Sequence, residues 1–219
     1  MRHTDEIEHI YIESSLRDGI IARNLESRTH GVRIDYTDRP QEILDHYRKG
    51  GSLDDKRVLL LYRFPGKFMS TCPGSDGMVC CNYFVINFGY GCLFDCHYCF
   101  LQSYLNNPLL TVFGNIEDLF SELDQKITGK NFHFRIGTGE TTDSLVLEPW
   151  TGMAETLVKH FAELPKATLE LKTKSSNVES LLGLDHCGKT VMSWALNPDR
   201  IMQEIETGDL DGKISSFLM

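Results

Sequence analysis

The chain lacks any hydrophobic run that approaches the roughly 20 residues needed by a membrane-spanning helix. Its N-terminal sequence, MRHTDEIEHI, is polar and acidic and lacks the hydrophobic stretch of a secretory signal. These absences favour a cytoplasmic location without a membrane partner. Of its 219 residues, 41% are hydrophobic and 24% are charged, as is usual for a globular protein with a buried core.

Positive charge is also scarce, since 22 Lys and Arg residues face 31 Asp and Glu residues and leave a net charge of −9. Nonspecific binding to a phosphate backbone needs a basic surface, so this balance argues against broad attraction to nucleic acid. A locally basic cleft is still compatible with it. Positive side chains of the second half include Lys166, Lys172, Lys174, Lys189 and Arg200.

The seven cysteines are odd in number and too unevenly spaced for a disulfide framework. Cys92, Cys96 and Cys99 form a C-x3-C-x2-C motif, and such crowding in a cytosolic protein indicates metal binding. Three thiolates can ligate three irons of a [4Fe–4S] cube and leave the fourth iron open to a small molecule. Gly89 and Gly91 allow the loop backbone to approach the cluster, where its amides can bond to sulfur.

Structural zinc is the alternative for this motif. A zinc site would need a fourth ligand, with Cys80, Cys81 or His97 as the candidates. Zinc sites favour pairs spaced C-x2-C, and the longer first gap here fits that pattern poorly. Cys72 shares a Pro- and Gly-rich loop with Cys80 and Cys81. The alternatives for Cys80 and Cys81 are a second metal site, a redox pair or a packing role only. Cys187 is interpreted as a loop or core residue.

Residues 1–82 show no repeating plan and are predicted to form an N-terminal α+β extension. Within them, Pro40 to Gly50 is predicted as a short helix and Arg57 to Phe64 as a buried strand. From Tyr83 onward, strands and helices alternate. This change of pattern predicts a domain boundary after residue 82.

The regular part contains four predicted strands, at 83–88, 132–136, 167–173 and 190–196. The predicted helices are 116–127, 151–164, a short helix through residues 176–182, and a final helix that opens at 197–198. Asn115 is predicted to cap the first of these helices, and Ser176 and Glu179 are predicted to form a capping box.

Alternation of this kind predicts parallel strands joined by right-handed crossovers, and we favour part of a barrel over an open sheet. In parallel α/β barrels the chemistry gathers at the carboxyl ends of the strands. Each predicted strand is followed by a candidate group: the cysteine loop, then Gly137–Glu140, then Lys174 and then Asn197. We therefore expect these groups to share one rim of the barrel.

The cysteine motif, with Tyr98 before its last cysteine, resembles the cluster motif of the radical S-adenosylmethionine (radical SAM) superfamily. The longer strings Gly91-Cys92 and Cys96 to Gln102 resemble the spore photoproduct lyase branch in particular. Similar blocks follow at 135–144, 171–174 and 194–198. The resemblance extends over about half of the chain, and the cysteine block is its most specific part.

This resemblance implies a partial (β/α)6 radical SAM barrel over residues 83–207, with about four strand–helix units, and a divergent tail over 208–219. It implies that Cys92, Cys96 and Cys99 hold a [4Fe–4S] cluster whose free iron binds SAM. Reductive cleavage of SAM then yields a 5′-deoxyadenosyl radical, which abstracts a hydrogen atom from the substrate. Nucleic acid, in a lyase reaction similar to DNA repair, is the candidate substrate, and flavodoxin or ferredoxin is the kind of reductant implied.

The resemblance also assigns contacts with SAM. Tyr98 is expected to pack beside the adenine. Gly137, Gly139 and Glu140 are expected to hold the amino group, with a flexible backbone and a carboxylate opposite an ammonium. Thr142 matches a family position that contacts SAM.

Lys174 stands where the family places a lysine near the SAM carboxylate, although a lone lysine at a strand end is otherwise usually solvated. Asn197 is expected either to contact SAM or to cap the helix that follows it. Three neighbours have structural alternatives: an ion pair inside the barrel for Arg135, an orienting or packing role for His97, and a loop carboxylate without a ligand for Asp143.

Two departures from the family change the expected function. Photoproduct lyases return a hydrogen atom from a cysteine, and Glu140 occupies that position when Arg135 and Asp143 are matched to the family. Since a carboxylate cannot donate a hydrogen atom as a thiol can, we expect a related enzyme with a different substrate. The six-unit barrel of the family also requires two further strand–helix units, and the sequence before Met219 does not contain them. We therefore expect a truncated chain or a missing half supplied by another chain. The alternatives are a non-catalytic cysteine–metal module, with iron–sulfur or zinc, and an inactive truncated fragment.

Overall fold

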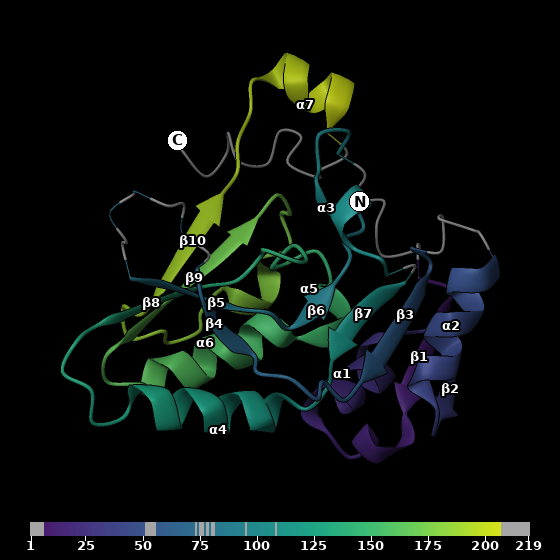
Figure 1. The fold of residues 1–219 in the computed structure, drawn as a ribbon, viewed down its shortest axis with the longest axis horizontal. Helices are drawn as coiled ribbons and strands as arrows, with labels where there is room; N and C mark the ends of the chain where they lie inside the picture. The colour runs from purple at the N-terminus through teal and green to yellow at the C-terminus, as the bar shows by residue number, and fades with distance from the viewer. Residues whose placement is uncertain are drawn as a thin grey trace.

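The computed structural model describes residues 7–50, 56–72, 74, 77, 79, 82–94, 96–107 and 109–206. Within these residues the strands form two five-stranded sheets, in the orders β2-β1-β3-β7-β6 and β10-β9-β8-β5-β4 (Figure 1). No helix in these ranges is long and apolar enough to cross a membrane. The cytoplasmic location stays a prediction.

The first sheet is largely parallel and contains the N-terminal part of the chain. Its strands, in sheet order, are β2 (Arg33–Thr37), β1 (His9–Glu13), β3 (Val58–Tyr62), β7 (Leu110–Phe113) and β6 (Gly89–Tyr90). β1 pairs in parallel with β2 and β3, β3 pairs in parallel with β7, and β6 pairs antiparallel with β7. The connections contain η1 (Ser14–Leu16), a short 3₁₀ helix, and the helices α1 (Ile20–Arg28) and α2 (Pro40–Gly50).

The repeating order β1-α1-β2-α2-β3 was not predicted for this part of the chain. The sequences of β1 and β2, HIYIE and RIDYT, cover five residues each, and β2 buries none of its side chains fully. Polar and apolar residues nevertheless alternate in both segments, with Ile10 and Ile12 buried in β1, and such alternation over four to eight residues is the usual signal of a strand. The sequence therefore contained this signal, and the prediction missed it. The helix at α2 and the buried strand at β3 were predicted and are confirmed.

The second sheet contains the partial barrel. β5 (Tyr83–Ile86), β8 (Phe134–Gly137), β9 (Ala167–Thr173) and β10 (Thr190–Trp194) are parallel neighbours in that order. β4 (Met69–Thr71) adds an antiparallel strand beside β5. All four predicted barrel strands are confirmed, with small differences at their ends.

Helices cover one side of the second sheet. α4 (Ile116–Ile127), α5 (Glu148–Thr151) and α6 (Met153–Glu163) lie below it in Figure 1, with α4 and α6 side by side. The Phe120 ring of α4 stacks on the His160 ring of α6 at a centroid distance of 4.0 Å. The other helical segments are α3 (Leu101–Tyr104), the 3₁₀ helix η2 (Glu179–Leu181) and α7 (Asp199–Ile205), which follows β10 at the top of the view.

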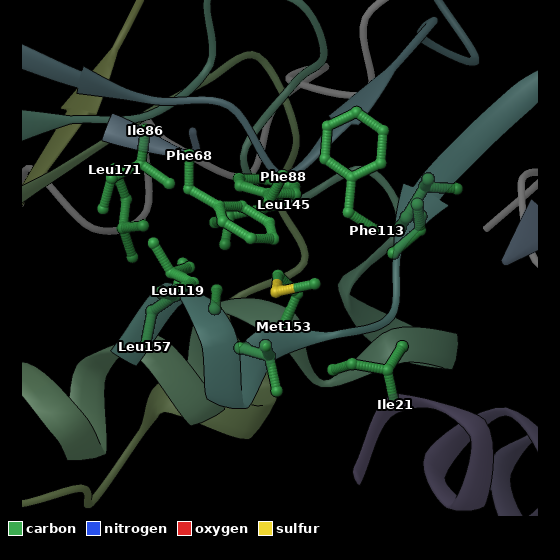
Figure 2. Packing of buried hydrophobic residues seen from close by; sticks show 14 of the residues in the cluster. Ile21, Phe68, Ile86, Phe88, Phe113, Leu119, Leu145, Met153, Leu157 and Leu171 are labelled. Atoms are coloured by element: carbon green, nitrogen blue, oxygen red, sulfur yellow. The ribbon is translucent and has the colours of Figure 1, made fainter. Parts of the chain in front are cut away.

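One hydrophobic cluster extends from the first sheet to the second. It includes Ile12 of β1, Phe113 of β7 and Leu171 of β9. Figure 2 shows side chains of this cluster from both parts of the chain, among them Ile21 and Met153. The domain boundary after residue 82 stays a prediction, and residues on both sides of it contribute to this cluster.

Asn115 occupies the predicted N-cap position of α4, but its side chain makes no cap bond. Its Oδ1 accepts a hydrogen bond from the Phe64 backbone N at 2.8 Å, and its Nδ2 donates to the Phe64 carbonyl oxygen at 3.1 Å. Asn115 therefore anchors the loop after β3, because a distant backbone offers it both a donor and an acceptor.

Two further helix starts also differ from prediction. The capping box of Ser176 and Glu179 does not form, because Val178 occupies the N-cap position of the short η2 and no side chain caps it. The helix expected from Thr151 begins at Met153. Gly152 has a φ of +57° and separates α5 from α6, since a left-handed residue cannot continue a right-handed helix.

Candidate functional site

The carboxyl ends of β5, β8, β9 and β10 lie at one edge of the second sheet, because these strands are parallel neighbours. The segments that follow them contain the residues predicted for the site. Hydrogen bonds connect these segments to one another. Residues far apart in sequence therefore share one rim.

The cysteine loop begins at a constrained glycine. Gly91 has a φ of +87°, and a Cβ atom there would lie 3.2 Å from the Leu109 carbonyl oxygen. Glycine alone adopts this conformation freely in so little space. The Gly91 backbone N donates to the Thr141 carbonyl oxygen at 3.0 Å, and the Thr141 hydroxyl donates to the Gly89 carbonyl oxygen at 2.7 Å. These bonds join the base of the cysteine loop to the loop after β8.

The three predicted thiol ligands lie within this loop. Cys96 is buried, whereas Cys92 and Cys99 are half-buried. The Cys99 backbone N donates to the Cys96 carbonyl oxygen at 2.9 Å and closes the turn between them. Burial, followed by the charge of Asp143, raises the pKa of the Cys92 thiol, and backbone hydrogen bonds from Phe94 and Asp143 oppose that rise.

This donor set fits an iron–sulfur cluster, because thiolates are its usual ligands and backbone amides that bond to sulfur tune its potential. No three His, Cys, Asp or Glu side chains in the described part of the chain are arranged to hold a metal ion. The ligands of a cube sit on separate irons and do not converge on one ion, so the three thiols stay predicted ligands. Cys80 and Cys81 lie outside the described residues, and Cys72 and Cys187 are free.

The two glycines after β8 are required by packing. A Cβ atom on Gly137 would lie 1.7 Å from the hydroxyl oxygen of Tyr83, which donates to Glu170 at 2.8 Å. Gly139 has a φ of +87°, and its Cβ atom would lie 2.7 Å from the Lys172 carbonyl oxygen. Close neighbours therefore account for glycine at both positions, and contact of either residue with SAM stays a prediction.

Arg135 and His97 both have exposed side chains. The Arg135 guanidinium lies 5.6 Å from the centre of the Tyr83 ring, so the predicted ion pair inside the barrel is wrong. The backbone N of His97 donates to the Ile205 carbonyl oxygen at 2.9 Å. This bond holds the end of α7 against the cysteine loop.

Thr142 carries a hydrogen-bonding group that the described protein residues leave unused. The residue is 4% exposed, and within the described part of the chain its hydroxyl oxygen has no hydrogen-bond partner. A buried polar group without a partner costs roughly 1–3 kcal/mol. A ligand atom would remove that cost, so the position suits the predicted contact with SAM. Glu140 is half-buried in the same loop.

Asp143 joins the loop after β8 to the end of β9. Its carboxylate accepts hydrogen bonds from the backbone N of Leu145 at 2.9 Å and of Val146 at 3.0 Å. It also accepts bonds from the Thr173 hydroxyl at 2.6 Å and the Lys174 backbone N at 2.7 Å. Burial raises the pKa of this carboxyl, and the same hydrogen bonds oppose the rise. These contacts agree with the alternative prediction of a loop carboxylate without a ligand.

Tyr98, Lys174 and Asn197 converge on the carboxylate of Glu206, which the sequence did not single out. Lys174 Nζ donates to Glu206 Oε1 at 2.6 Å, and the Asn197 amide and the Tyr98 hydroxyl donate to the same oxygen. The Glu206 side chain is 3% exposed, and burial raises its pKa. No local pattern marks Glu206, because Tyr98 and Lys174, two of its three partners, come from distant segments of the chain.

Asn197 makes these contacts in place of a helix cap, since Pro198 occupies the N-cap position of α7. Its amide also donates to the Tyr98 hydroxyl at 3.3 Å. Lys174 Nζ lies 5.6 Å from the centre of the Tyr98 ring. The structure therefore brings three of the predicted SAM-binding residues into mutual contact.

Comparison with known proteins gives a consistent result for this chain. The family model described as "Spore photoproduct lyase" matches residues 76–216. A spore photoproduct lyase of Bacillus subtilis (strain 168) is 27% identical over 221 residues, which cover 94% of this chain and 61% of that protein. One of Geobacillus sp. (strain Y412MC61) is 26% identical over 144 residues, which cover 65% of this chain and 40% of that protein. The chain thus spans less than two thirds of the length of these relatives.

Solved structures of spore photoproduct lyase share the fold. One complexed with dinucleoside spore photoproduct superposes with a TM-score of 0.79 at 21% sequence identity, over 96% of this chain and 63% of that chain. A mutant with bound AdoMet and dinucleoside spore photoproduct gives a TM-score of 0.78 over the same shares of the two chains. At this level of identity the likeness establishes the fold, including the partial barrel.

Proposed function

Because the chain belongs to the spore photoproduct lyase family, we propose that it is a radical SAM enzyme. In this proposal Cys92, Cys96 and Cys99 hold a [4Fe–4S] cluster, and the loops after β8, β9 and β10 hold SAM. The cluster, when bound, supplies the electron that cleaves SAM to methionine and a 5′-deoxyadenosyl radical. The three thiols on one loop carry the proposal, since three protein ligands leave one iron of a cube for SAM.

Side chains of the rim support the proposed roles in SAM binding. The Thr142 hydroxyl, which has no partner in the part of the chain that the structure describes, offers the ligand a hydrogen bond. Lys174 offers the carboxylate of the ligand a positive charge. Glu140 offers a negative charge opposite the amino group, with the backbone of the loop beside it. Tyr98 is 50% exposed between two of the cysteines and offers a ring face to the adenine, and Asn197 offers an amide.

We further propose a damaged nucleic acid as the substrate class. A relative of known structure is complexed with dinucleoside spore photoproduct. Phe100 and Tyr104, beside the cysteine loop, are 61% and 71% exposed, and exposed aromatic rings offer stacking surfaces for bases. Repair of that photoproduct ends when a cysteine returns a hydrogen atom, and Glu140 cannot do this. The substrate of this chain should therefore be a different lesion, whose reaction does not need a hydrogen atom from residue 140. A flavodoxin or ferredoxin is the proposed electron donor.

Anaerobic reconstitution with iron and sulfide tests the proposal. The wild-type protein should bind roughly four irons, and addition of dithionite and SAM should release 5′-deoxyadenosine and methionine. The Cys96→Ala variant should lose the visible absorbance of the cluster, because it lacks a ligand. The matched Cys187→Ala variant should retain it, since Cys187 is exposed and lies outside the motif.

Two results would contradict the proposal in different ways. A colourless protein with one equivalent of zinc would identify a cysteine–metal module. A fully loaded cluster that releases no deoxyadenosine with SAM would refute an enzymatic role for this chain.

A further inference from the structure

We infer that Glu206 competes with SAM from within the protein. Its carboxylate occupies the hydrogen-bond donors that would otherwise bind the carboxylate of SAM. The inference rests on the proposed function, because it takes Lys174 as the residue that binds the SAM carboxylate. The new element is Glu206, whose carboxylate resembles that of SAM. Glu206 must release its hydrogen-bond donors before the SAM carboxylate can bind to them.

The donors form what we term the carboxylate cradle: the Tyr98 hydroxyl, Lys174 Nζ and the Asn197 amide. They come from three segments that meet at the rim, namely the cysteine loop, the end of β9 and the link between β10 and α7. All three donate to one oxygen of Glu206, and Lys174 adds a positive charge at 2.6 Å. Converging donors that include a cation are a typical binding arrangement for a carboxylate.

Glu206 and the carboxylate of SAM cannot occupy the cradle together. All three donors bond to Glu206 Oε1, while Lys174 Nζ also donates to the Ala195 carbonyl oxygen at 3.2 Å and the Asn197 amide also donates to the Tyr98 hydroxyl. A second carboxylate at these donors would lie so close to Glu206 that the two negative charges would repel each other. The Glu206 side chain is 3% exposed and the Lys174 side chain is 18% exposed, so this ion pair is largely withdrawn from solvent. Binding of SAM at Lys174 therefore requires the Glu206 side chain to move out.

The position of Glu206 in the fold makes such movement feasible. It follows α7, a helix of seven residues that stands clear of the two sheets in Figure 1. The Ile205 carbonyl oxygen is tied to the His97 backbone N of the cysteine loop. A short peripheral helix opens at a lower free-energy cost than a core strand. Displacement of Glu206 would thus loosen a contact of the cysteine loop at the moment when SAM binds.

The apparent affinity for SAM is reduced by the fraction of molecules whose cradle is occupied. If Glu206 fills the cradle in nine of ten molecules, its removal should tighten SAM binding on the order of tenfold. The effect should depend on the carboxylate of the ligand. Decarboxylated SAM does not need the cradle, so its affinity should not depend on Glu206.

The experiment measures dissociation constants by anaerobic equilibrium dialysis on the full chain reconstituted with iron and sulfide. SAM and decarboxylated SAM are compared on the wild type, Glu206→Gln and Glu206→Ala. The matched control is Glu204→Gln, because Glu204 lies in α7 two residues before Glu206, is 58% exposed and pairs with Arg200. Both Glu206 variants should bind SAM on the order of tenfold more tightly, with decarboxylated SAM and the control unchanged.

The other outcomes separate this inference from the proposed function. If the wild type binds SAM and both Glu206 variants bind it equally or more weakly, the inference is wrong and the proposed function stands. Equal tightening for SAM and decarboxylated SAM would also overturn it, because the competition would not be for a carboxylate. If no protein binds SAM at all, the proposed function fails and the inference fails with it.

Discussion

Asp143 holds two loops of the rim in register through one carboxylate. It accepts three backbone N–H groups and one hydroxyl, so every neighbour is a donor. One of these donors is the backbone N of Lys174, which sets where the Lys174 side chain leaves the strand. Thr142, the preceding residue, is buried, and its hydroxyl has no hydrogen-bond partner among the described residues. Asp143 thus positions its neighbours for a ligand that it does not itself contact in the proposed function.

The Asp143→Asn variant tests this role. The new amide keeps an oxygen for the three donors that bond to Oδ1, but it places an NH2 group against the Lys174 backbone N–H, so the free energy of unfolding should fall on the order of 1–3 kcal/mol. Urea denaturation with the linear extrapolation provides the measurement. Asp185→Asn is the matched control, because Asp185 is exposed and accepts a bond from the Cys187 backbone N at 3.0 Å. Equal losses in the two variants would rule out a special role for Asp143.

At the scale of helices and strands, an ion pair joins the two halves of the molecule. Arg28 of α1 donates to Glu155 of α6 at 2.8 Å, and Lys159 of α6 donates to the same carboxylate at 2.6 Å. α1 belongs to the connections of the first sheet, and α6 covers the second. The hydrogen bond from Lys159, followed by that from Arg28, lowers the pKa of the Glu155 carboxyl.

This pair should give the stability a defined pH dependence. The folded pKa of Glu155 lies below its ordinary value of 4.5, so the ionised carboxylate adds stability above that pH. This contribution is lost as the pH falls through the folded pKa. The Glu155→Gln variant should therefore be less stable than wild type by about 0.5–1 kcal/mol at neutral pH, and the difference should shrink as the pH falls below 4.5 and through the folded pKa.

Thermal unfolding of both proteins across that pH range measures the effect. Glu163→Gln, at an exposed position of the same helix, is the control and should change stability less throughout. A wild-type advantage over Glu155→Gln that persists or grows in acid would contradict the assignment.

At the scale of the whole molecule, the two sheets share one core. Phe113 of β7 is 0% exposed and stacks on the Phe64 ring at a centroid distance of 4.2 Å. It belongs to the same buried cluster as Leu169 of β9 and Leu157 of α6. Since a shared core couples the elements that line it, the two sheets should unfold together.

The Phe113→Ala variant tests this coupling. Loss of a fully buried ring should lower the free energy of unfolding by about 3–5 kcal/mol. Hydrogen exchange measured by mass spectrometry should show faster exchange in β1 and in β9 together. Phe132→Ala is the control, because Phe132 is 45% exposed, and it should have a smaller effect. Faster exchange confined to the first sheet would show that the sheets unfold independently.

Local patterns in the sequence determined the bounds of several helices and strands, the cysteine motif and the parallel arrangement of the second sheet. The bounds of β9 and α4 were predicted because apolar side chains alternate in the first and recur at helical spacing in the second. The spacing of Cys92, Cys96 and Cys99, with the residues around them, indicated the family, because three thiols on one short loop are a local feature. Parallel strands with candidate groups at their carboxyl ends also followed from the order of segments.

Only the tertiary structure decided which distant groups meet. The sequence did not reveal that β7 pairs with β3 in a sheet begun by β1 and β2. Asn115 bonds to Phe64, 51 residues away, and Lys174 bonds to Glu206, 32 residues away. Pairings of this kind depend on strand order and on which chain segments pack at the rim. The spacing of residues in the sequence reveals neither the strand order nor this packing, so Glu206 was found in the carboxylate cradle only in the folded molecule.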